Sequence, residues 1–379
     1  MRVLEVTEAS GSGTLGIVQT LAAGLSSAGH EVAVAFGRRP ETPSDLASEL
    51  PDAVELVALP WAHRSPSQQV AAGRALRRLA RDWRPDIVHL HSSFAGAIGS
   101  LALHGRAPLV YTPHGYAFGR SDPRLRRAAY WGVEWIVARR CAMVGAVSEA
   151  EAALARRWLR APRVTVVPNG IPELDPGAQV GTPPRTRTEI VAMGRIDPER
   201  RPAGATRILA AVAAATEARV TWIGAAKGGE HGPLESAGIA VTGWLPRRAA
   251  VERLSAATIY LHWSASDGLS LAILEALAND VVVVASDIPA NREILGLGQV
   301  CREEAEAIEL VLAILGDKGL REALLNEQRT RRARWGARRM VDDWTAVYRG
   351  LLAAGAPRAG TAIRPGSSVL TRNIRTPWN

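Results

Sequence analysis

Residues 2–36 decide the fold, and they read RVLEVTEASGSGTLGIVQTLAAGLSSAGHEVAVAF. Residues 2–7 alternate apolar and polar side chains with the period of two that is typical of a strand. Apolar residues at helical spacing follow the glycine-rich turn at 10–13 and end at Gly29, before a second strand at 31–36. The segment therefore predicts a strand, a turn, a helix and a second strand, in that order.

The same alternation continues to residue 168. The predicted elements are a helix at 68–81, a strand at 87–91, a helix at 94–103, a strand at 108–112, a helix at 124–140 and strands at 142–147 and 164–167. Strands that are separated by helices form parallel sheets with both faces covered. We therefore expect residues 1–168 to form a doubly wound, Rossmann-like α/β domain.

A second half of the same kind follows a stretch at 169–188 that is rich in Pro, Gly and Thr and predicts a linker. Within 189–328 the predicted strands lie at 189–193, 219–223, 239–242, 258–262 and 281–285, and the helices at 203–214, 247–256, 270–278 and 303–315. One long helical pattern spans 320–352, and we expect its part at 329–354 to pack back toward the first domain. The remainder, 355–379, has little periodicity and predicts a disordered tail.

Composition excludes several classes of protein. The chain has 379 residues, of which 47% are hydrophobic and 22% charged, which is typical of a globular protein with two or three domains. Its two cysteines, Cys141 and Cys301, lack the spacing of a disulfide framework or a structural zinc site. Neither a secretory leader nor an apolar run of about 18 residues is present. We expect a cytoplasmic protein.

The net charge of +9 is concentrated at the C-terminal end, where residues 329–379 hold eleven arginines against Asp342 and Asp343. This pattern fits a solvated basic helix, and it also fits attraction to an anionic membrane surface. Nucleic acid is disfavoured as a partner, because no pattern of stacking aromatics accompanies the charge.

The first motif is the glycine-rich turn Gly11-Ser12-Gly13, which lies between a strand and a helix. Backbone N–H groups and the helix dipole make an anion site at such a place. Gly11, Gly13 and Gly16 also match a dinucleotide fingerprint, but residues 36–39 read FGRR where an acidic residue is expected, although the two arginines would suit a 2′-phosphate. A tight turn needed only for packing is the alternative.

Histidines end two predicted strands. His89, His91 and Ser92 end the strand at 87–91, and His114 follows the strand at 108–112. Both ends point to the edge of the sheet where ligands bind in doubly wound folds. We expect a functional role for His114 and a buried, hydrogen-bonded position for His89. Zinc binding by His91 and His114 is disfavoured, because no Asp, Glu or Cys is suitably spaced to complete a site.

The second half carries arginines after its first predicted strand and carboxylates around the start of a predicted helix. Arg195 and Arg200 follow its first strand and would suit a diphosphate, although a plain surface loop is the alternative. The segment SDGLSLAILE at 266–275 places Asp267 before a helix N-terminus and Glu275 one turn within the helix. Free N–H groups there could hold phosphate while Glu275 accepts hydrogen bonds from hydroxyl groups. Asp267 could instead be a simple helix cap.

In this order and spacing, the motifs resemble the retaining glycosyltransferases of family 4. The segments that carry the resemblance are EASGSG, VHLHSS, VYTPHG, VSEAE, VPNGI, GRIDPERRP, VTGWLP and SDGLSLAILEALA, within residues 1–350. The resemblance implies the glycosyltransferase B fold, in which two doubly wound parallel-sheet domains face each other across a cleft. The first domain would bind the acceptor and the second the nucleotide sugar.

The resemblance also implies an activity and a set of residues. It implies metal-independent, cofactor-independent transfer of a hexose or N-acetylhexosamine from a nucleoside-diphosphate sugar, with UDP favoured over GDP, to a hydroxyl acceptor in glycan or natural-product biosynthesis. His114 and Asp267 would contact the transferred sugar, and Arg195 and Arg200 the diphosphate. The other donor-binding residues would be Gly11, Ser12, Gly13, Gly194, Trp244, Ser270, Leu271, Ala272 and Glu275, and the acceptor-binding residues His91, Ser92 and Tyr116.

The chain departs from the family pattern at a few positions. Asp267 stands where Glu is usual, Arg200 where Lys is usual, and Ala272 and Asp280 replace a common Pro and Gly. Two other functions therefore stay open: a sugar-nucleotide 2-epimerase, for which we see no carboxylate placed in the crevice, and a catalytically inactive nucleotide-sugar-binding or membrane scaffold protein.

The helix at 124–140 mixes arginines with Tyr130, Trp131 and Trp135. This composition is typical of a helix that lies on a membrane or binds a lipid-linked acceptor. A helix that packs its tryptophans inward is the alternative. The first interpretation predicts peripheral contact with the inner face of the membrane.

Overall fold

The computed structural model describes residues 1–8, 13–39, 42, 46–63, 65–119, 122–175, 177, 187–226, 228–229 and 231–355. Contacts within the chain divide it into two compact units. Unit 1 comprises Met1–Val147, Glu151–Val167 and the chain from Asp342 onward, and unit 2 comprises Ser148–Ala150 and Pro168–Val341. Much of the predicted linker, and the predicted tail from residue 356, lie outside the described residues.

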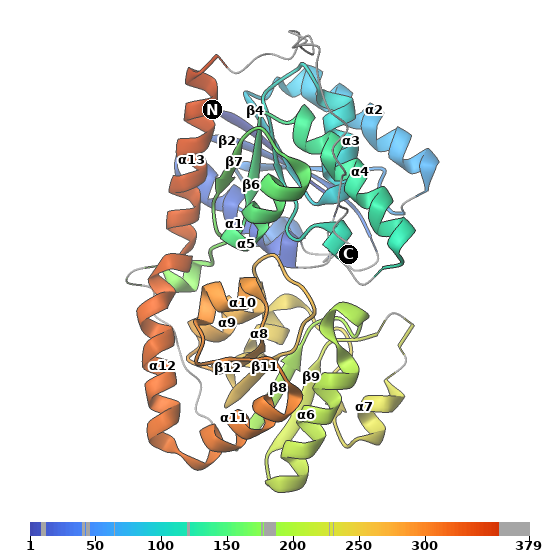
Figure 1. Cartoon of the computed structure of the whole chain (residues 1–379). Coiled ribbons are helices and arrows are strands. Elements are labelled where there is room, and N and C mark those ends of the chain that lie inside the picture. The colour runs from blue at the N-terminus through green and yellow to red at the C-terminus, as the bar shows by residue number, and fades with distance from the viewer. Residues whose placement is uncertain are drawn as a thin grey trace. The chain divides into compact units, whose positions relative to one another are not determined.

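The described part of unit 1 contains a parallel sheet of seven strands (Figure 1), in the order β3-β2-β1-β4-β5-β6-β7. The strands are β1 (Arg2–Thr7), β2 (Glu31–Gly37), β3 (Val54–Leu59), β4 (Ile87–His91), β5 (Leu109–Thr112), β6 (Met143–Ala146) and β7 (Val164–Val166). The strand order changes direction between β1 and β4, which is where ligands bind in doubly wound folds.

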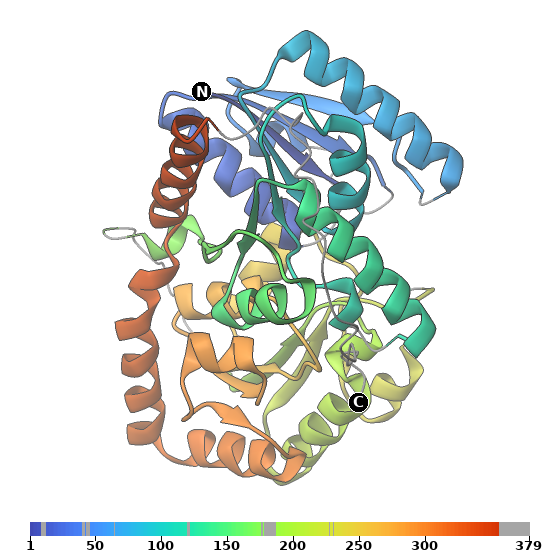
Figure 2. The ribbon, with the colours of Figure 1, turned by 45° about the horizontal axis from the view of Figure 1, so that its top comes forward.

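Helices cover both faces of this sheet. On one face α2 (Pro66–Trp83), α3 (Ser93–Leu103) and α4 (Arg124–Arg140) pack side by side over an apolar core (Figures 1 and 2). On the other face lie α1 (Gly13–Ser27) and the part of α13 (Ala337–Ala353) that belongs to unit 1. The short helix α5 (Glu149–Leu154) follows β6.

The two faces of this sheet differ in chemistry because side chains alternate along each strand. Glu5 lies opposite His89, and Thr7 opposite His91, in the parallel register of β1 and β4. These four polar side chains therefore share the face that α13 covers. Their apolar neighbours along the strands, such as Leu90, point to the face beneath α2, α3 and α4.

Unit 2 repeats the topology, with six described parallel strands in the order β10-β9-β8-β11-β12-β13. The strands are β8 (Glu189–Met193), β9 (Arg219–Ile223), β10 (Ala240–Val241), β11 (Ile259–His262), β12 (Val282–Ser286) and β13 (Val300–Cys301). The helices are α6 (Pro202–Ala215), α7 (Gly232–Ser236), α8 (Arg247–Ser255), α9 (Leu271–Ala278), α10 (Pro289–Leu295), α11 (Glu304–Gly316) and α12 (Lys318–Arg332). Here the strand order changes direction between β8 and β11. Both α/β units thus have the predicted doubly wound parallel sheet.

The predicted single helix at 320–352 is wrong. The structure has α12, a 3-10 turn at Ala333–Trp335 and then α13. The backbone of Ile171 hydrogen-bonds to Trp335 at 3.0 Å and to Ala337 at 3.1 Å, so these groups are not available to a continuous helix. Gly336 lies between them, and a Cβ atom at this position would overlap Asp175.

Several short elements were not predicted, namely β3, α5, α7, α10 and β13. Among the described residues, no helix combines the length and the apolar character needed to cross a bilayer.

Candidate functional site

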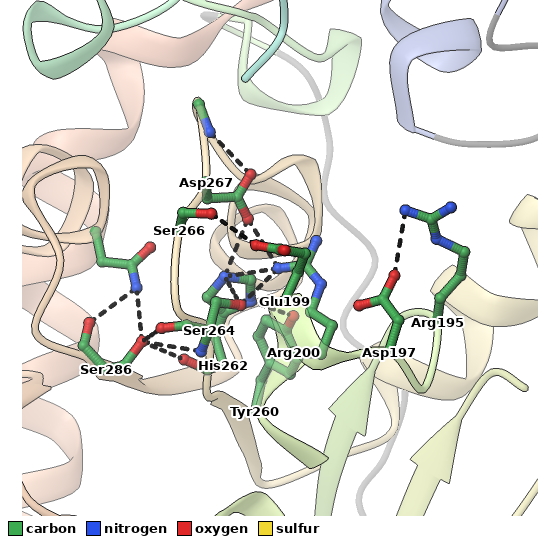
Figure 3. Close-up of polar contacts among 12 residues, drawn as sticks. Arg195, Asp197, Glu199, Arg200, Tyr260, His262, Ser264, Ser266, Asp267 and Ser286 are labelled. Atoms are coloured by element: carbon green, nitrogen blue, oxygen red, sulfur yellow. Dashed lines mark hydrogen bonds and ion pairs between the residues drawn. The ribbon is translucent and has the colours of Figure 1, made fainter. Parts of the chain in front are cut away.

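The carboxyl edge of the unit 2 sheet carries the residues predicted to bind a diphosphate. Figure 3 shows a cluster of side chains around Arg200 and, apart from it, Arg195 with Asp197. Gly194 and Arg195 follow β8, Arg200 ends a 3-10 turn at Pro198–Arg200, and Asp267 follows β11. Because β8 and β11 are the neighbouring strands at which the sheet order changes direction, these residues lie where doubly wound folds bind ligands.

Arg200 is held by contacts with three side chains. Its Nη1 donates to Asp267 Oδ2 at 2.8 Å and to Ser264 Oγ at 2.7 Å, and lies 3.2 Å from His262 Nε2. Burial alone would raise the pKa of Asp267, but the Arg200 charge and the contact with His262 hold it below its usual range. Asp267 is therefore ionised at neutral pH. The guanidinium keeps a defined orientation at the edge of the sheet.

The loop before α9 is tied to the same turn. Ser266 Oγ donates to Glu199 Oε2 at 2.9 Å, and the Ala265 N–H donates to the Glu199 carbonyl at 2.8 Å. Beneath them, the Tyr260 hydroxyl and His262 Nδ1 are hydrogen-bonded at 2.7 Å. Figure 3 shows that these side chains converge on Arg200. Loop and turn thus hold each other in place.

Arg195 and Gly194 differ from Arg200 in environment. The Arg195 side chain is 62% exposed and pairs with Asp197 at 3.3 Å, so it can reorient toward a ligand. Gly194 has a φ of 131°, which favours glycine, and a Cβ atom there would approach Arg200 Nε to 3.2 Å. A glycine at this position leaves room for the Arg200 side chain.

The N-terminus of α9 is open. Ser270 is the N-cap, yet its hydroxyl bonds none of the helix N–H groups, and this buried Oγ has no partner among the described residues. Leu271 and Ala272 form the first turn, whose N–H groups also lack partners within the helix. The alternative that Asp267 caps the helix is wrong, because its Oδ1 accepts from the Gly268 N–H at 3.0 Å instead. A buried, unpaired hydroxyl at a helix N-terminus points to an anionic ligand.

Glu275 is buried within α9, and its Oε1 accepts from Arg247 Nε at 2.9 Å. Burial raises the pKa of Glu275 and the Arg247 charge opposes this shift. Trp244, predicted near the nucleobase, is 50% exposed and follows Gly243. Sequence reasoning missed Arg247; its position at the start of α8, shortly after Trp244, was the available signal.

The unit 1 sheet has its own candidate site at the carboxyl ends of β1, β4 and β5. Four polar atoms there are buried without a partner among the described residues: Thr7 Oγ1, Ser92 Oγ, His114 Nδ1 and Tyr116 OH. Thr7, Ser92 and His114 lie within two residues of a strand end, whereas Tyr116 packs against Phe118. Buried polar atoms are nearly always hydrogen-bonded in native proteins, so the three unpaired ones at the strand ends indicate a place for a polar ligand. Ser92, His114 and Tyr116 are among the predicted residues, and Thr7 was missed.

The predicted acceptor contact of His91 gains no support. His91 is 1% exposed, its Nε2 bonds to Glu5 Oε2 at 2.6 Å and its Nδ1 to His114 Nε2 at 2.9 Å. Both ring nitrogens are occupied, so His91 lies behind His114 and does not reach a ligand in this arrangement. His89 is buried and hydrogen-bonded as predicted, with Tyr348 and Thr112 as partners.

We predicted that no acidic residue is placed to complete a metal site with these histidines, and this prediction is wrong. Glu5, His89 and His91 place ligand atoms within 4.8 Å of one another. Each of these atoms, however, already has a side-chain partner, because His91 Nε2 bonds to Glu5 and His89 Nδ1 bonds to Tyr348 OH at 2.7 Å. We therefore interpret the group as a hydrogen-bonded cluster.

Two of the predicted donor-binding residues, Gly11 and Ser12, lie outside the described residues. Gly13 is the first residue of α1, so a helix begins at the last residue of the predicted motif.

Comparison with family models identifies the class of protein. The model described as Glycosyltransferase Family 4 matches residues 13–173, and the model described as Glycosyl transferases group 1 matches residues 187–333. Together they span most of the chain. Both halves of the chain thus match glycosyltransferase models, and the chain is a glycosyltransferase.

Solved structures share the fold of this glycosyltransferase. Sucrose-phosphate synthase from Thermosynechococcus elongatus is 16% identical over 94% of this chain and 100% of that chain, with a TM-score of 0.78. HepE from Anabaena, solved with UDP-glucose, is 17% identical over 93% and 100%, with a TM-score of 0.72. WaaG, a glycosyltransferase involved in lipopolysaccharide biosynthesis, is 14% identical over 92% and 100%, with a TM-score of 0.71. The comparison with curated proteins gives no match.

Proposed function

We propose that this glycosyltransferase moves a hexose or N-acetylhexosamine from a nucleoside-diphosphate sugar to a hydroxyl acceptor, with retention at the anomeric carbon. The observation that carries the proposal is the guanidinium of Arg200, held by Asp267, Ser264 and His262 at the ligand-binding edge of unit 2. The leaving diphosphate gains negative charge in the transition state. A preoriented cation stabilises such charge without reorganisation.

The reaction would break the bond between the anomeric carbon and the diphosphate oxygen. A new bond to the acceptor oxygen would form on the same face of the sugar, and the acceptor proton would pass to the leaving phosphate oxygen. No protein base is required, because the leaving phosphate takes the acceptor proton. Arg195 and the open N-terminus of α9, with the unpaired Ser270 hydroxyl, would add donors to the diphosphate.

We favour UDP as the nucleotide and propose that no metal ion is needed. HepE, which shares the fold, was solved with UDP-glucose. In unit 2 the cationic groups at the candidate site are arginine side chains, which can balance a diphosphate charge themselves.

A thermal-shift panel of nucleotide sugars, with and without a chelator, tests this function. A donor at about 100 times its dissociation constant adds roughly 2.7 kcal/mol of stability, and we expect UDP-sugars to give the largest shift in either condition. Slow release of UDP from that donor should follow. Formation of an epimer, or tight binding with no turnover for any acceptor, would overturn the assignment. An epimerase is not favoured, because Glu5, the carboxylate nearest to the histidines, is completely buried.

For the acceptor, we propose one that is held at an anionic membrane surface contacted by α4. Leu125, Val133, Trp135 and Ile136 of this helix are 85%, 41%, 37% and 45% exposed. The helix contains five arginines, and its single acidic residue, Glu134, is buried. Trp131 turns inward and donates to the Trp158 carbonyl at 3.1 Å, so one tryptophan packs and the other faces out. Exposed apolar side chains flanked by cations suit an anionic lipid surface.

Flotation with vesicles of anionic and of neutral lipid tests this surface. We expect recovery with anionic vesicles only, and loss of recovery in Leu125→Glu. The matched control is Leu297→Glu, which changes a 75% exposed leucine in unit 2 and should float like the wild type. Recovery of the wild type in the soluble fraction alone would exclude the membrane contact and leave the transferase assignment intact.

A further inference from the structure

A chain of hydrogen bonds crosses the polar face of unit 1 from Glu5 to His114. Glu5 Oε2 lies 2.6 Å from His91 Nε2, and His91 Nδ1 lies 2.9 Å from His114 Nε2. The chain ends at His114 Nδ1, which is buried and has no partner in the described part of the protein. Three consecutive side chains thus connect a buried carboxyl group to one unpaired ring nitrogen.

The imidazoles of His91 and His114 are both neutral. Burial lowers the pKa of His91 to about 3 and the pKa of His114 well below its usual value. A neutral imidazole has one nitrogen that donates and one that accepts. Each hydrogen bond needs one donor and one acceptor, so the proton position on Glu5 dictates the proton position on both rings.

We propose that Glu5 is a positioning residue that sets the tautomer of His114 through His91, and so decides whether His114 Nδ1 donates or accepts a hydrogen bond. When Glu5 is protonated, it donates to His91 Nε2, His91 Nδ1 donates to His114 Nε2, and His114 Nδ1 carries a proton. When Glu5 is ionised, His91 Nε2 donates to it, His114 Nε2 donates to His91, and His114 Nδ1 is a bare acceptor.

The surroundings of Glu5 favour the first arrangement at neutral pH. Burial raises the pKa of Glu5 to about 8, although a hydrogen bond from Tyr348 opposes the shift. The titratable groups that face Glu5 are His89 and His91 from β4 and Tyr348 from α13, at 3.5, 2.6 and 3.5 Å. None of these three carries a positive charge at neutral pH that would stabilise a carboxylate.

The backbone holds His114 in place at the end of this chain. His114 has a φ of 52°, which is uncommon for a residue other than glycine. The next residue, Gly115, donates its N–H to Glu151 Oε1 at 2.6 Å. Tyr116, two residues further along, has an unpaired hydroxyl, and burial raises its pKa, so it stays neutral. At neutral pH His114 would therefore offer an N–H to a ligand oxygen; that this oxygen belongs to the transferred sugar rests on the proposed function.

Nitrogen NMR of the full protein labelled with ¹⁵N-histidine tests this coupling between Glu5 and His114 directly, because protonated and bare ring nitrogens differ strongly in chemical shift. Signals of His114 among the eight histidines are assigned by their loss in His114→Gln. In the wild type we expect the proton on Nδ1 at pH 6.5 and on Nε2 at pH 9.5. A tautomer that is the same at both pH values would overturn the proposal, and this arm needs no variant of Glu5 to fold.

Two variants separate Glu5 from its neighbours. Glu5→Gln presents an amide that can donate to His91 at every pH, so His114 should keep its proton on Nδ1 at pH 9.5. Tyr348→Phe removes the hydroxyl beside Glu5 without touching His91 and should leave the tautomer at pH 6.5 unchanged. If Glu5→Gln followed the wild-type change with pH, or Tyr348→Phe altered the tautomer at pH 6.5, Glu5 would not be the controlling group.

Turnover gives a separate readout. Glu5→Ala, which removes the donor to His91, should lower kcat about tenfold at neutral pH, and Glu5→Gln should restore it, as expected for one net hydrogen bond. Failure of the transferase assignment would appear as no turnover in the wild type while the tautomer still changes with pH. Failure of the coupling between Glu5 and His114 would appear as an unchanged tautomer in an active enzyme.

Discussion

Removing one partner of the Arg200–Asp267 ion pair should destabilise unit 2 as much as removing both. The two side chains are 27% and 17% exposed, and the nitrogen and oxygen atoms lie 2.8 Å apart. Arg200→Met leaves a mostly buried carboxylate without its cation, and Asp267→Asn leaves a mostly buried guanidinium without its anion. Each single change should cost about 3 kcal/mol of unfolding free energy.

The double variant carries neither charge. It has lost the contacts of Arg200 with Ser264 and with His262, but Arg200→Met has lost them too, so the double variant should cost no more than that single change, about 3 kcal/mol. Additive effects would give about 6 kcal/mol, so the expected coupling energy is about 3 kcal/mol. Arg195→Met is the matched control, because its side chain is 62% exposed and its ion pair should contribute less than about 1 kcal/mol.

Native-state hydrogen exchange is the suitable assay, because a chain with two units need not unfold in one step. The amide groups of β8 and β11 report on unit 2 alone. Calorimetry with UDP on the same variants measures the role in binding. Arg200→Met should weaken UDP binding about 30-fold, which corresponds to about 2 kcal/mol for a lost charged hydrogen bond.

Additive costs, within about 0.5 kcal/mol, would refute the reasoning, since independent sites add in this way. In that case Arg200 would not be fixed by Asp267. If Arg200→Met bound UDP as tightly as the wild type, Arg200 would not contact the donor. The ion pair with Asp267 would then have a structural role only.

Three further predictions concern other sites. Burial raises the pKa of Glu5 in the folded protein to about 8, from an ordinary value of 4.5. The stability that is linked to its protonated form is therefore complete below pH 4.5 and is lost as the pH rises to 8, by about 1.4 kcal/mol per pH unit. In denaturant titrations, Glu5→Gln should lack this dependence on pH. A Cβ atom on Gly145 would overlap the Trp344 ring, so Gly145→Ala should lower the melting temperature, whereas Gly132→Ala, in open space on α4, should stabilise by about 0.4–1 kcal/mol. Glu275→Ala should weaken UDP binding by roughly 2 kcal/mol in calorimetry; an unchanged dissociation constant would exclude Glu275 from the donor-binding residues.

The regular elements could be predicted from the chain because their patterns are local. The helix at 124–140 and the strands at 189–193 and 219–223 have the predicted bounds. The partly exposed edge strand β3 was missed although its sequence, VELVAL, is apolar at five of six positions. The break at Gly336 was missed because it depends on pairing with Ile171, far away in the sequence.

The residues of the candidate site that lie at strand ends could be predicted from the sequence, but the buried side chains behind them could not. Ser92 and His114 follow strands, and strand ends can be read from periodicity. Glu5 could not be matched to His91 from spacing, because they are 86 positions apart and meet only through the pairing of β1 with β4. Tyr348 joins them from the last helix, whose position depends on the packing of the whole unit.

The make-up of unit 1 affects how the protein can be synthesised. Its final segment begins at Asp342, so the ribosome must first produce residues 168–341, which at about 5–20 residues per second takes roughly 10 to 35 s. During that interval Gly145 lacks its contact with Trp344, and Glu5 lacks its contact with Tyr348. The nascent unit 1 is therefore incomplete until this segment has been synthesised. A premature stop codon near residue 340 would strand it in that unfinished state.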